Sequence, residues 1–160
     1  MEIKKILYAT DLSENCPARC YKALEFAAKL GAKVVILHVL EQLPQTTASI
    51  MQWFADGENV IRNYEEKGKV YAKERINDAI KTFCAENSAK YPDCTNLVDR
   101  IEVVVGYAAE EILQKLNEYG CDAVIMGTHS KGIITNTFLG STVERVLRHV
   151  RKPAFVFPEG

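Results

Sequence analysis

Short apolar segments alternate with helical patterns along almost the whole of this 160-residue chain. Strands are expected at about 3–9, 33–40, 97–105, 122–126 and 154–157, and helices from a turn at 11–13 to about 30 and at about 58–89, 109–120 and 140–150. The segment at 33–40 is a near-continuous run of valine, isoleucine and leucine, which suits a parallel strand covered on both faces. The alternation therefore predicts an α/β fold in which helices cover both faces of a parallel sheet.

The chain is expected to form one domain, spanning residues 1–160. At this length roughly 70% of the unfolded chain's surface can be buried, which is enough for a full core. Residues 41–57 are less regular, and we interpret them as a connection with room for one short helix. In the long helix that follows, Tyr64, Tyr71 and Ile76 lie on one helical stripe, and Gly68 locally weakens the helical preference.

Composition and charge exclude several classes of protein. The formal net charge of -1 gives no reason to expect nucleic-acid binding by bulk electrostatics. The longest apolar stretch, from Val34 to Leu40, is interrupted by His38 and is too short to span a bilayer. Residues 1–5 lack the apolar segment of a signal peptide. The chain is therefore expected to be cytoplasmic, with neither a membrane nor a nucleic acid as a partner.

The five cysteines, at positions 16, 20, 84, 94 and 121, form no CxxC pattern, so a zinc site is not expected. Cys16 and Cys20 are four residues apart and can share a helix face, which leaves a redox pair open as an alternative. We interpret them as small buried or half-buried thiols, which is the usual state of free cysteines in protein interiors.

The loop after the fourth expected strand has the composition of an anion site. It begins Gly-Thr-His-Ser-Lys-Gly at 127–132 and ends Gly-Ser-Thr at 140–142, where the last expected helix starts. Backbone N–H groups and the positive end of the helix dipole would face the same point there, and glycines allow a phosphate to approach closely. The alternative is a flexible loop with an ordinary serine or threonine cap.

Candidate residues follow different strands but fall at the same end of the expected sheet. Asp11 follows the first strand, Val39 is near the end of the second, and Gly127 follows the fourth. In open parallel sheets, ligands bind at the carboxyl ends of the strands, where the strand order reverses. If the first and fourth strands are neighbours, these three residues meet in one crevice.

Several segments, in this order, resemble the nucleotide-binding kind of universal stress protein along nearly the whole chain. They are KILYATDLS at 5–13, VVILHV at 34–39, VG at 105–106, EEIL at 110–113, AVIMGTH at 123–129, LGSTVE at 139–144 and KPAFV at 152–156. Pattern and resemblance together predict a Rossmann-like, three-layer α/β/α fold. Its five-stranded parallel sheet is expected to have the strand order 3-2-1-4-5.

The family's ATP-binding signature resembles Gly-x2-Gly-x9-Gly-Ser/Thr. Gly127, Gly140 and Ser141 occupy its first, third and fourth places, whereas Ser130 stands where the pattern has glycine. If that place requires a positive φ, serine is strained there by roughly 1–2 kcal/mol, and its side chain would crowd the phosphates. Because serine is small and its hydroxyl can donate to a phosphate, we expect weakened binding rather than none.

The resemblance also implies a role for each matching residue. Asp11 would lie beside the sugar and phosphate end of an adenine nucleotide, and Val39 would offer its backbone N–H and C=O to the adenine edge. Met126 and Gly127 would line the floor of the site. The residues implied to surround the phosphates are His129, Ser130, Gly140, Ser141 and Thr142. The alternatives are that Asp11 only caps the first helix and that His129 is an exposed loop imidazole.

No enzyme signature accompanies these residues. The sequence has no GxxxxGK[ST] loop and no GxGxxG after the first strand, and it shows no motif for nucleophilic catalysis. We therefore expect a stress-response or signalling module that binds ATP, or AMP or ADP, with Mg²⁺ as an optional companion. The alternatives are an interaction protein of the same fold that binds no nucleotide, and a slow ATPase.

The last expected strand, Ala154–Phe157, is short and apolar. At a sheet edge it would leave unpaired backbone groups and two phenylalanines facing water. Pairing with the same strand of a second copy, across a two-fold axis, would satisfy both. The resemblance points the same way, so we expect a homodimer. The alternative is an edge that the chain itself caps, with Pro153 and Pro158 making the strand less suitable for pairing.

Overall fold

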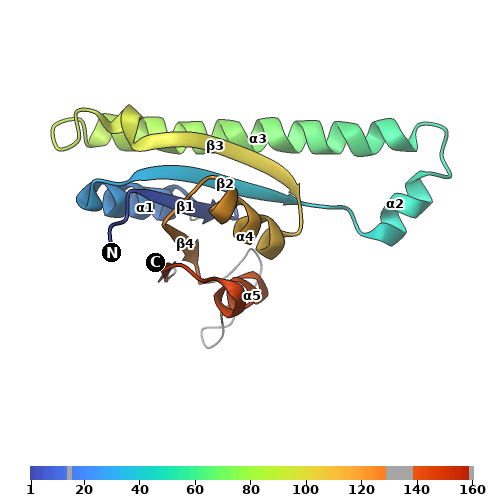
Figure 1. Cartoon of the computed structure of the whole chain (residues 1–160). Coiled ribbons are helices and arrows are strands. Elements are labelled where there is room, and N and C mark those ends of the chain that lie inside the picture. The colour runs from blue at the N-terminus through green and yellow to red at the C-terminus, as the bar shows by residue number, and fades with distance from the viewer. Residues whose placement is uncertain (14–15, 129–138, 159–160) are drawn as a thin grey trace.

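In the part of the chain that the structure describes, the sheet has five parallel strands in the order β3-β2-β1-β4-β5 (Figure 1). The computed structural model describes residues 1–13, 16–128 and 139–158. The strands are β1 (Lys5–Thr10), β2 (Lys33–Glu41), β3 (Val98–Gly106), β4 (Ala123–Gly127) and β5 (Ala154–Phe157). The strand order therefore reverses between β1 and β4, which are neighbours. This topology confirms the expected fold class.

Helices cover both faces of the sheet. They are α1 (Cys16–Leu30), α2 (Gln45–Met51), α3 (Gly57–Glu86), α4 (Ala108–Glu118) and α5 (Ser141–His149), with a 3-10 turn, η1, at Cys94–Leu97. The helices α1 and α3 pack on one face, and α4 and α5 pack on the other. Figure 1 shows α2 projecting beyond the end of the sheet, and α2 has no buried residue. None of the described helices has both the length and the apolar character needed to cross a bilayer.

The central strands are apolar at nearly every position because both of their faces are buried. In β1, Ile6 packs with α1 and α3, whereas Leu7 packs with α4 and α5. In β2, Val34 and Val35 divide between the two faces in the same way. Successive side chains of a strand point to opposite faces, so a strand covered on both sides shows a continuous apolar run rather than an alternation.

Gly68 lies within α3 against the side chain of Leu40 in β2. A Cβ atom at position 68 would be 2.8 Å from Leu40 Cδ2, so a side chain there would force the leucine to move. The helix nevertheless continues for 30 residues. Its buried positions, which include Ile76 and Phe83, provide the tertiary packing that stabilises most protein helices.

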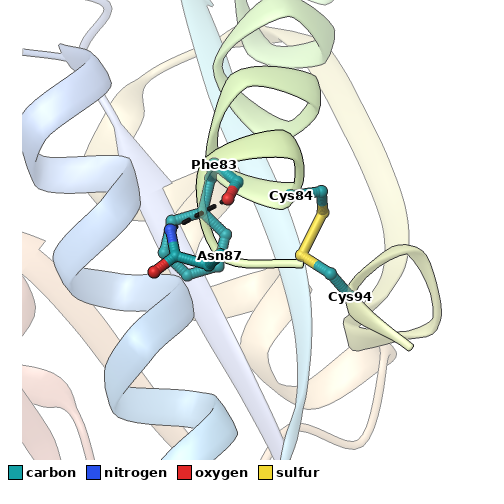
Figure 2. Close-up of a disulfide and its surroundings, with 4 residues drawn as sticks. All are labelled: Phe83, Cys84, Asn87 and Cys94. Carbon is teal, nitrogen blue, oxygen red and sulfur yellow. Dashed lines mark hydrogen bonds between the residues drawn. A yellow bond between two sulfur atoms is a disulfide. The ribbon is translucent and has the colours of Figure 1, made fainter. Parts of the chain in front are cut away.

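A disulfide that the sequence did not predict joins Cys84, near the end of α3, to Cys94 in η1. Figure 2 shows this bond beside the last turns of α3, where the Asn87 amide donates a hydrogen bond to the Phe83 carbonyl. The other three cysteines are buried free thiols, which confirms the interpretation of the pair in α1. Burial raises the pKa of the Cys20 thiol to about 12, so this thiol stays protonated and unreactive at neutral pH.

The β5 strand forms the outer edge of the described sheet, beside β4. The expectation that its two phenylalanines would face water is wrong, because Phe26 of α1 packs against both. The ring centroids of Phe26 and Phe155 are 4.8 Å apart, and those of Phe26 and Phe157 are 5.8 Å apart. All four residues of β5 are half-buried. Phe26 thus covers the aromatic rings, whereas the outer side of the β5 backbone has no neighbouring strand in the described sheet.

Candidate functional site

A cavity of about 490 Å³ lies at the carboxyl ends of β1, β2 and β4. This is the point where the strand order reverses, which is where ligands bind in open parallel sheets. Ligand cavities typically measure roughly 300–1,000 Å³, so the volume suits a small organic molecule. The predicted site residues on the cavity wall are Asp11, Val39, Met126, Gly127 and Thr142.

The two carboxylate oxygens of Asp11 have different surroundings. Oδ1 accepts hydrogen bonds from the Ser13 N–H at 3.0 Å and from Arg19 Nη1 at 3.5 Å. Oδ2 is buried and has no hydrogen-bond partner among the described residues. A buried polar atom left without a partner costs roughly 1–3 kcal/mol, so Oδ2 is a strong candidate to accept a donor from a ligand. The bond to Ser13 forms an Asx turn before α1 rather than a cap on that helix.

The loop after β1 is fixed in an uncommon conformation. Leu12 has a φ of 56°, in the left-handed region, and its N–H donates to Thr10 Oγ1 at 3.2 Å. Arg75 of α3 donates to the Leu12 carbonyl at 2.8 Å and to the Ser13 carbonyl at 3.4 Å. A positive φ at a residue other than glycine persists only where the surroundings hold it. Arg75, which the sequence did not predict as a site residue, supplies that support from α3.

The β2 strand extends beyond the end of β1 and leaves backbone open beside the cavity. The last pair between these strands joins Thr10 to His38, whereas the pairing of β2 with β3 continues to Glu41. Past His38, no strand of the described residues therefore lies on the side of β2 that faced β1. This open backbone around Val39 is what the expected contact with the edge of an adenine ring requires.

Met126 and Gly127 end β4 at the floor of the cavity. Met126 is buried in the core with α4 and α5. Gly127 leaves room for Arg19 of α1, because a Cβ atom at position 127 would lie only 2.8 Å from Arg19 Nη1. Arg19 is itself buried and forms an ion pair with Asp11. The close approach of a guanidinium group therefore explains the glycine at this position.

The N-terminus of α5 lies beside the end of β4. The Gly140 N–H donates to the Thr128 carbonyl at 2.8 Å, which joins the two segments. Of Gly140, Ser141 and Thr142, the structure places Thr142 on the cavity wall. His129 and Ser130 lie outside the described residues, so their expected roles stay predictions.

Two tyrosines of α3 complete the wall, although the sequence suggested only that they belong to an apolar stripe. Tyr64 and Tyr71 line the cavity and remain about half exposed. The guanidinium carbon of Arg75 lies 5.7 Å from the centroid of the Tyr71 ring. The wall therefore combines aromatic faces, a cation and a carboxylate, which suits a ligand with both a flat ring and polar groups.

Comparison with known proteins gives the same relatives by sequence and by structure. Residues 2–158 match the model of the Universal stress protein family. Universal stress protein MJ0577 of Methanocaldococcus jannaschii is 28% identical over 153 residues, covering 96% of this chain and 93% of that protein. The solved structure of MJ0577 has a TM-score of 0.75 at 26% identity, covering 100% of this chain and 99% of that one.

Two further solved structures share the fold and contain nucleotides. A universal stress protein in complex with cAMP is 16% identical with a TM-score of 0.59, covering 98% of this chain and 97% of that one. The universal stress protein from Archaeoglobus fulgidus in complex with dAMP is 17% identical with a TM-score of 0.56, covering 98% of both chains. At these identities, the likeness establishes the fold alone.

Proposed function

Because the chain belongs to the universal stress protein family, we propose that it is a stress-response or signalling module that binds an adenine nucleotide. The observation that carries the proposal is the cavity beside β1 and β4, where Asp11 Oδ2 is buried without a partner among the described residues. Proteins of the same fold have been solved with cAMP and with dAMP, which supports this class of ligand.

In the proposed complex, different parts of the cavity hold different parts of the nucleotide. Asp11 accepts a hydrogen bond from the sugar, and the open backbone at Val39 meets the adenine edge. Met126 and Gly127 form the floor. The N–H groups and the dipole at the start of α5 favour the negative phosphates. The residues proposed to surround the phosphates are His129, Ser130, Gly140, Ser141 and Thr142.

The proposal covers AMP, ADP and ATP, the last with or without Mg²⁺. No group of three histidine, cysteine or acidic side chains that could hold a metal ion occurs in the described part of the chain. Because Mg²⁺ keeps several waters and commonly binds through substrate phosphates, such an ion would arrive with the nucleotide. We propose no catalytic residue, and we expect hydrolysis to be at most slow.

Calorimetric titration with ATP tests the proposal in the wild type and in Gly140→Val. Gly140 has a φ of -61° and a ψ of 152°, which any residue adopts, so the backbone accepts valine while the added side chain obstructs the phosphates. We expect Gly140→Val to lose ATP binding, and the milder Gly140→Ala to retain part of it. Melting curves establish that both variants fold. Unchanged affinity in the valine variant would place the site elsewhere.

Two observations favour a second candidate, an interaction protein of the same fold without nucleotide binding. Ser130 stands in the place of the second signature glycine. The segment after α2 leaves Trp53 89% and Phe54 64% exposed, and exposed apolar patches often contact other proteins. An absence of ATP binding in the wild type and in Ser130→Gly would favour this candidate.

Under the leading proposal, Ser130→Gly binds ATP more tightly than the wild type. If this place requires a positive φ, relief of roughly 1–2 kcal/mol of backbone strain corresponds to a gain of about ten-fold or somewhat more. Weaker binding in the glycine variant would show instead that the serine hydroxyl donates to the ligand.

We also propose that the module is a cytoplasmic homodimer, joined by pairing of β5 with its copy across a two-fold axis. The support is the position of β5 as the outermost described strand and the open backbone along its outer side. The partner is a second copy of this chain, because an isologous contact of this kind closes on itself.

A further inference from the structure

Arg19 is a buried charge at the floor of the cavity. It lies in the first turns of α1, is 5% exposed as a residue, and contributes to the cavity wall. Burying a guanidinium group is unfavourable unless other groups compensate its charge. Asp11 is placed to do so, since its Oδ1 lies 3.5 Å from Arg19 Nη1.

The two oxygens of the Asp11 carboxylate differ in their hydrogen-bond partners. Oδ1 accepts from both Arg19 and the Ser13 N–H, whereas Oδ2 is buried with no partner among the described residues. Two donors on one oxygen fix the rotation of the carboxylate. An ionised carboxylate only accepts hydrogen bonds, so whatever satisfies Oδ2 must be a donor.

Gly127 leaves space for the guanidinium group of Arg19 at the end of β4. The position that a Cβ atom would occupy at residue 127 is 2.8 Å from Arg19 Nη1 and 3.3 Å from its Cζ. The group is thus enclosed between the end of β4 and the loop after β1. The Arg19 side chain is 6% exposed and the Asp11 side chain is 24% exposed, so the carboxylate is the more accessible of the two groups. Its Oδ2 also lacks a donor among the described residues.

We propose that Arg19 is a positioning residue, which holds Asp11 through Oδ1 so that Oδ2 accepts a hydrogen bond from a sugar hydroxyl of the ligand. This inference rests on the proposed binding of an adenine nucleotide. According to this inference, the Arg19–Asp11 pair selects ligands whose sugar carries a hydroxyl group. The competing role is direct contact between Arg19 and a phosphate, which the experiment below distinguishes.

The experiment measures the dissociation constants of ATP and adenosine, and of the 2′-deoxy and 3′-deoxy forms of adenosine. The proteins are the wild type, Arg19→Met, Asp11→Asn and the double variant. Arg100→Met is the matched control, because it removes the same charge from an exposed arginine that packs over Tyr119. Arg19→Lys retains the positive charge and is used if Arg19→Met does not fold.

We expect Arg19→Met to weaken ATP and adenosine equally, by roughly ten-fold, since a hydrogen bond to a charged group is being misplaced. This loss of affinity in Arg19→Met should disappear with the deoxy analogue that lacks the hydroxyl bound by Oδ2. It should also disappear in the Asp11→Asn background, because the two residues act through one contact. Arg100→Met should bind all four ligands as the wild type does.

Three results would overturn the inference. Weakening of ATP without weakening of adenosine would show that Arg19 contacts a phosphate. Equal weakening of all four ligands, additive with Asp11→Asn, would show that Arg19 only supports the fold. A wild type that binds neither ATP nor adenosine would overturn the proposed function as well, so the two failures are distinguishable.

Discussion

Position 127 is occupied by glycine because the Arg19 side chain lies against it. The two glycines that flank the loop after β4 therefore have different explanations. At Gly127 a side chain would meet the buried guanidinium group. Gly140 has a φ that suits any residue, and its N–H donates to the Thr128 carbonyl just after β4. A substitution of Gly127 therefore tests the packing beneath the cavity. A substitution of Gly140 tests the space in front of the start of α5.

Gly127→Ala should destabilise the protein and weaken nucleotide binding together. The new Cβ atom would be 2.8 Å from Arg19 Nη1 and must displace it, although Arg19 is 5% exposed and has little space to move into. We expect a loss of about 1–3 kcal/mol in the free energy of unfolding, the usual range for overpacking, measured by urea denaturation.

The control for this prediction is the same substitution in an Arg19→Met background. Methionine lacks the guanidinium group, so most of the destabilisation by Gly127→Ala should disappear there. Equal destabilisation in both backgrounds would mean that a neighbour other than Arg19 makes position 127 intolerant of a side chain.

At the scale of elements, Asp122 connects the start of β4 to the start of β1. Its Oδ2 accepts from the backbone N–H groups of Lys4 at 2.9 Å and Lys5 at 3.0 Å, while its own N–H donates to the Lys5 carbonyl. The hydrogen bonds from Lys4 and Lys5 lower the pKa of the Asp122 carboxyl below its ordinary value. The folded state therefore favours the charged form of Asp122.

The stabilisation by Asp122 should depend on pH in a defined direction. Because the folded state lowers the pKa, the contribution is fully present above the unfolded pKa of about 4 and is lost as the pH falls through the folded value. The difference in urea midpoint between the wild type and Asp122→Asn should therefore shrink between pH 7 and pH 3. Asp78→Asn, at an exposed position of α3, is the matched control. A difference in urea midpoint that stays constant from pH 7 to pH 3 would contradict a stabilising role for the charged Asp122 carboxylate.

The disulfide restricts the connection between α3 and β3. Cys84 and Cys94 are separated by 10 positions, so in the unfolded chain the bond closes a short loop. The cross-link lowers the conformational entropy of the unfolded chain, and reduction restores that entropy. We therefore expect reduction to lower the free energy of unfolding by about 2–3 kcal/mol. Denaturation with and without a dithiol reductant measures this difference.

The control is the double variant Cys84→Ala/Cys94→Ala, whose stability should not respond to the reductant, since the other cysteines are free thiols. Equal stability of the oxidised and reduced wild type would contradict the prediction. Disulfides are uncommon in the cytosol outside redox-sensing and hyperthermophilic proteins. The redox state of this pair in cells therefore also tests the proposed cytoplasmic location.

At the scale of the whole molecule, β5 presents an edge suited to pairing with a second copy. The carbonyls of Pro153 and Phe157 accept from Val124 and Thr128 on the β4 side. Because alternate residues of a strand direct their backbone groups to opposite sides, the N–H and C=O groups of Val156 point away from β4. Among the described residues no strand pairs with this outer edge of β5, which favours strand pairing with a second copy across a two-fold axis.

Val156→Pro should convert a dimer into a monomer without unfolding the chain. Proline removes an outward N–H, which is the arrangement that an edge strand tolerates, so the pairing with β4 is retained. Sedimentation at micromolar concentration measures the change, and Val156→Ala is the matched control that keeps the N–H. A wild type that already sediments as a monomer would contradict the proposed homodimer.

The pattern of the sequence was sufficient for the architecture because burial on both faces imposes a local rule. Strands such as β2 must be apolar at successive positions, and the helices between them must carry apolar stripes. Observed element boundaries differ from the expected ones by a few residues, as at the end of α3, where turns and fraying blur the pattern. Five predicted site residues line the cavity. Four of them, which include Asp11 and Gly127, do so because the ends of parallel strands converge, and the fifth, Thr142, lies in the first turn of α5.

The sequence by itself therefore determined the class of fold, the strand order inferred with the resemblance, and the end of the sheet at which the cavity lies. Only the tertiary structure decided which distant side chains meet there. Arg75 reaches the Leu12 carbonyl across 63 positions, Arg19 turns inward toward Asp11, and Phe26 covers the rings of β5. Local patterns cannot predict such contacts, because a charged or aromatic residue on a helix faces solvent or the interior according to what packs against it.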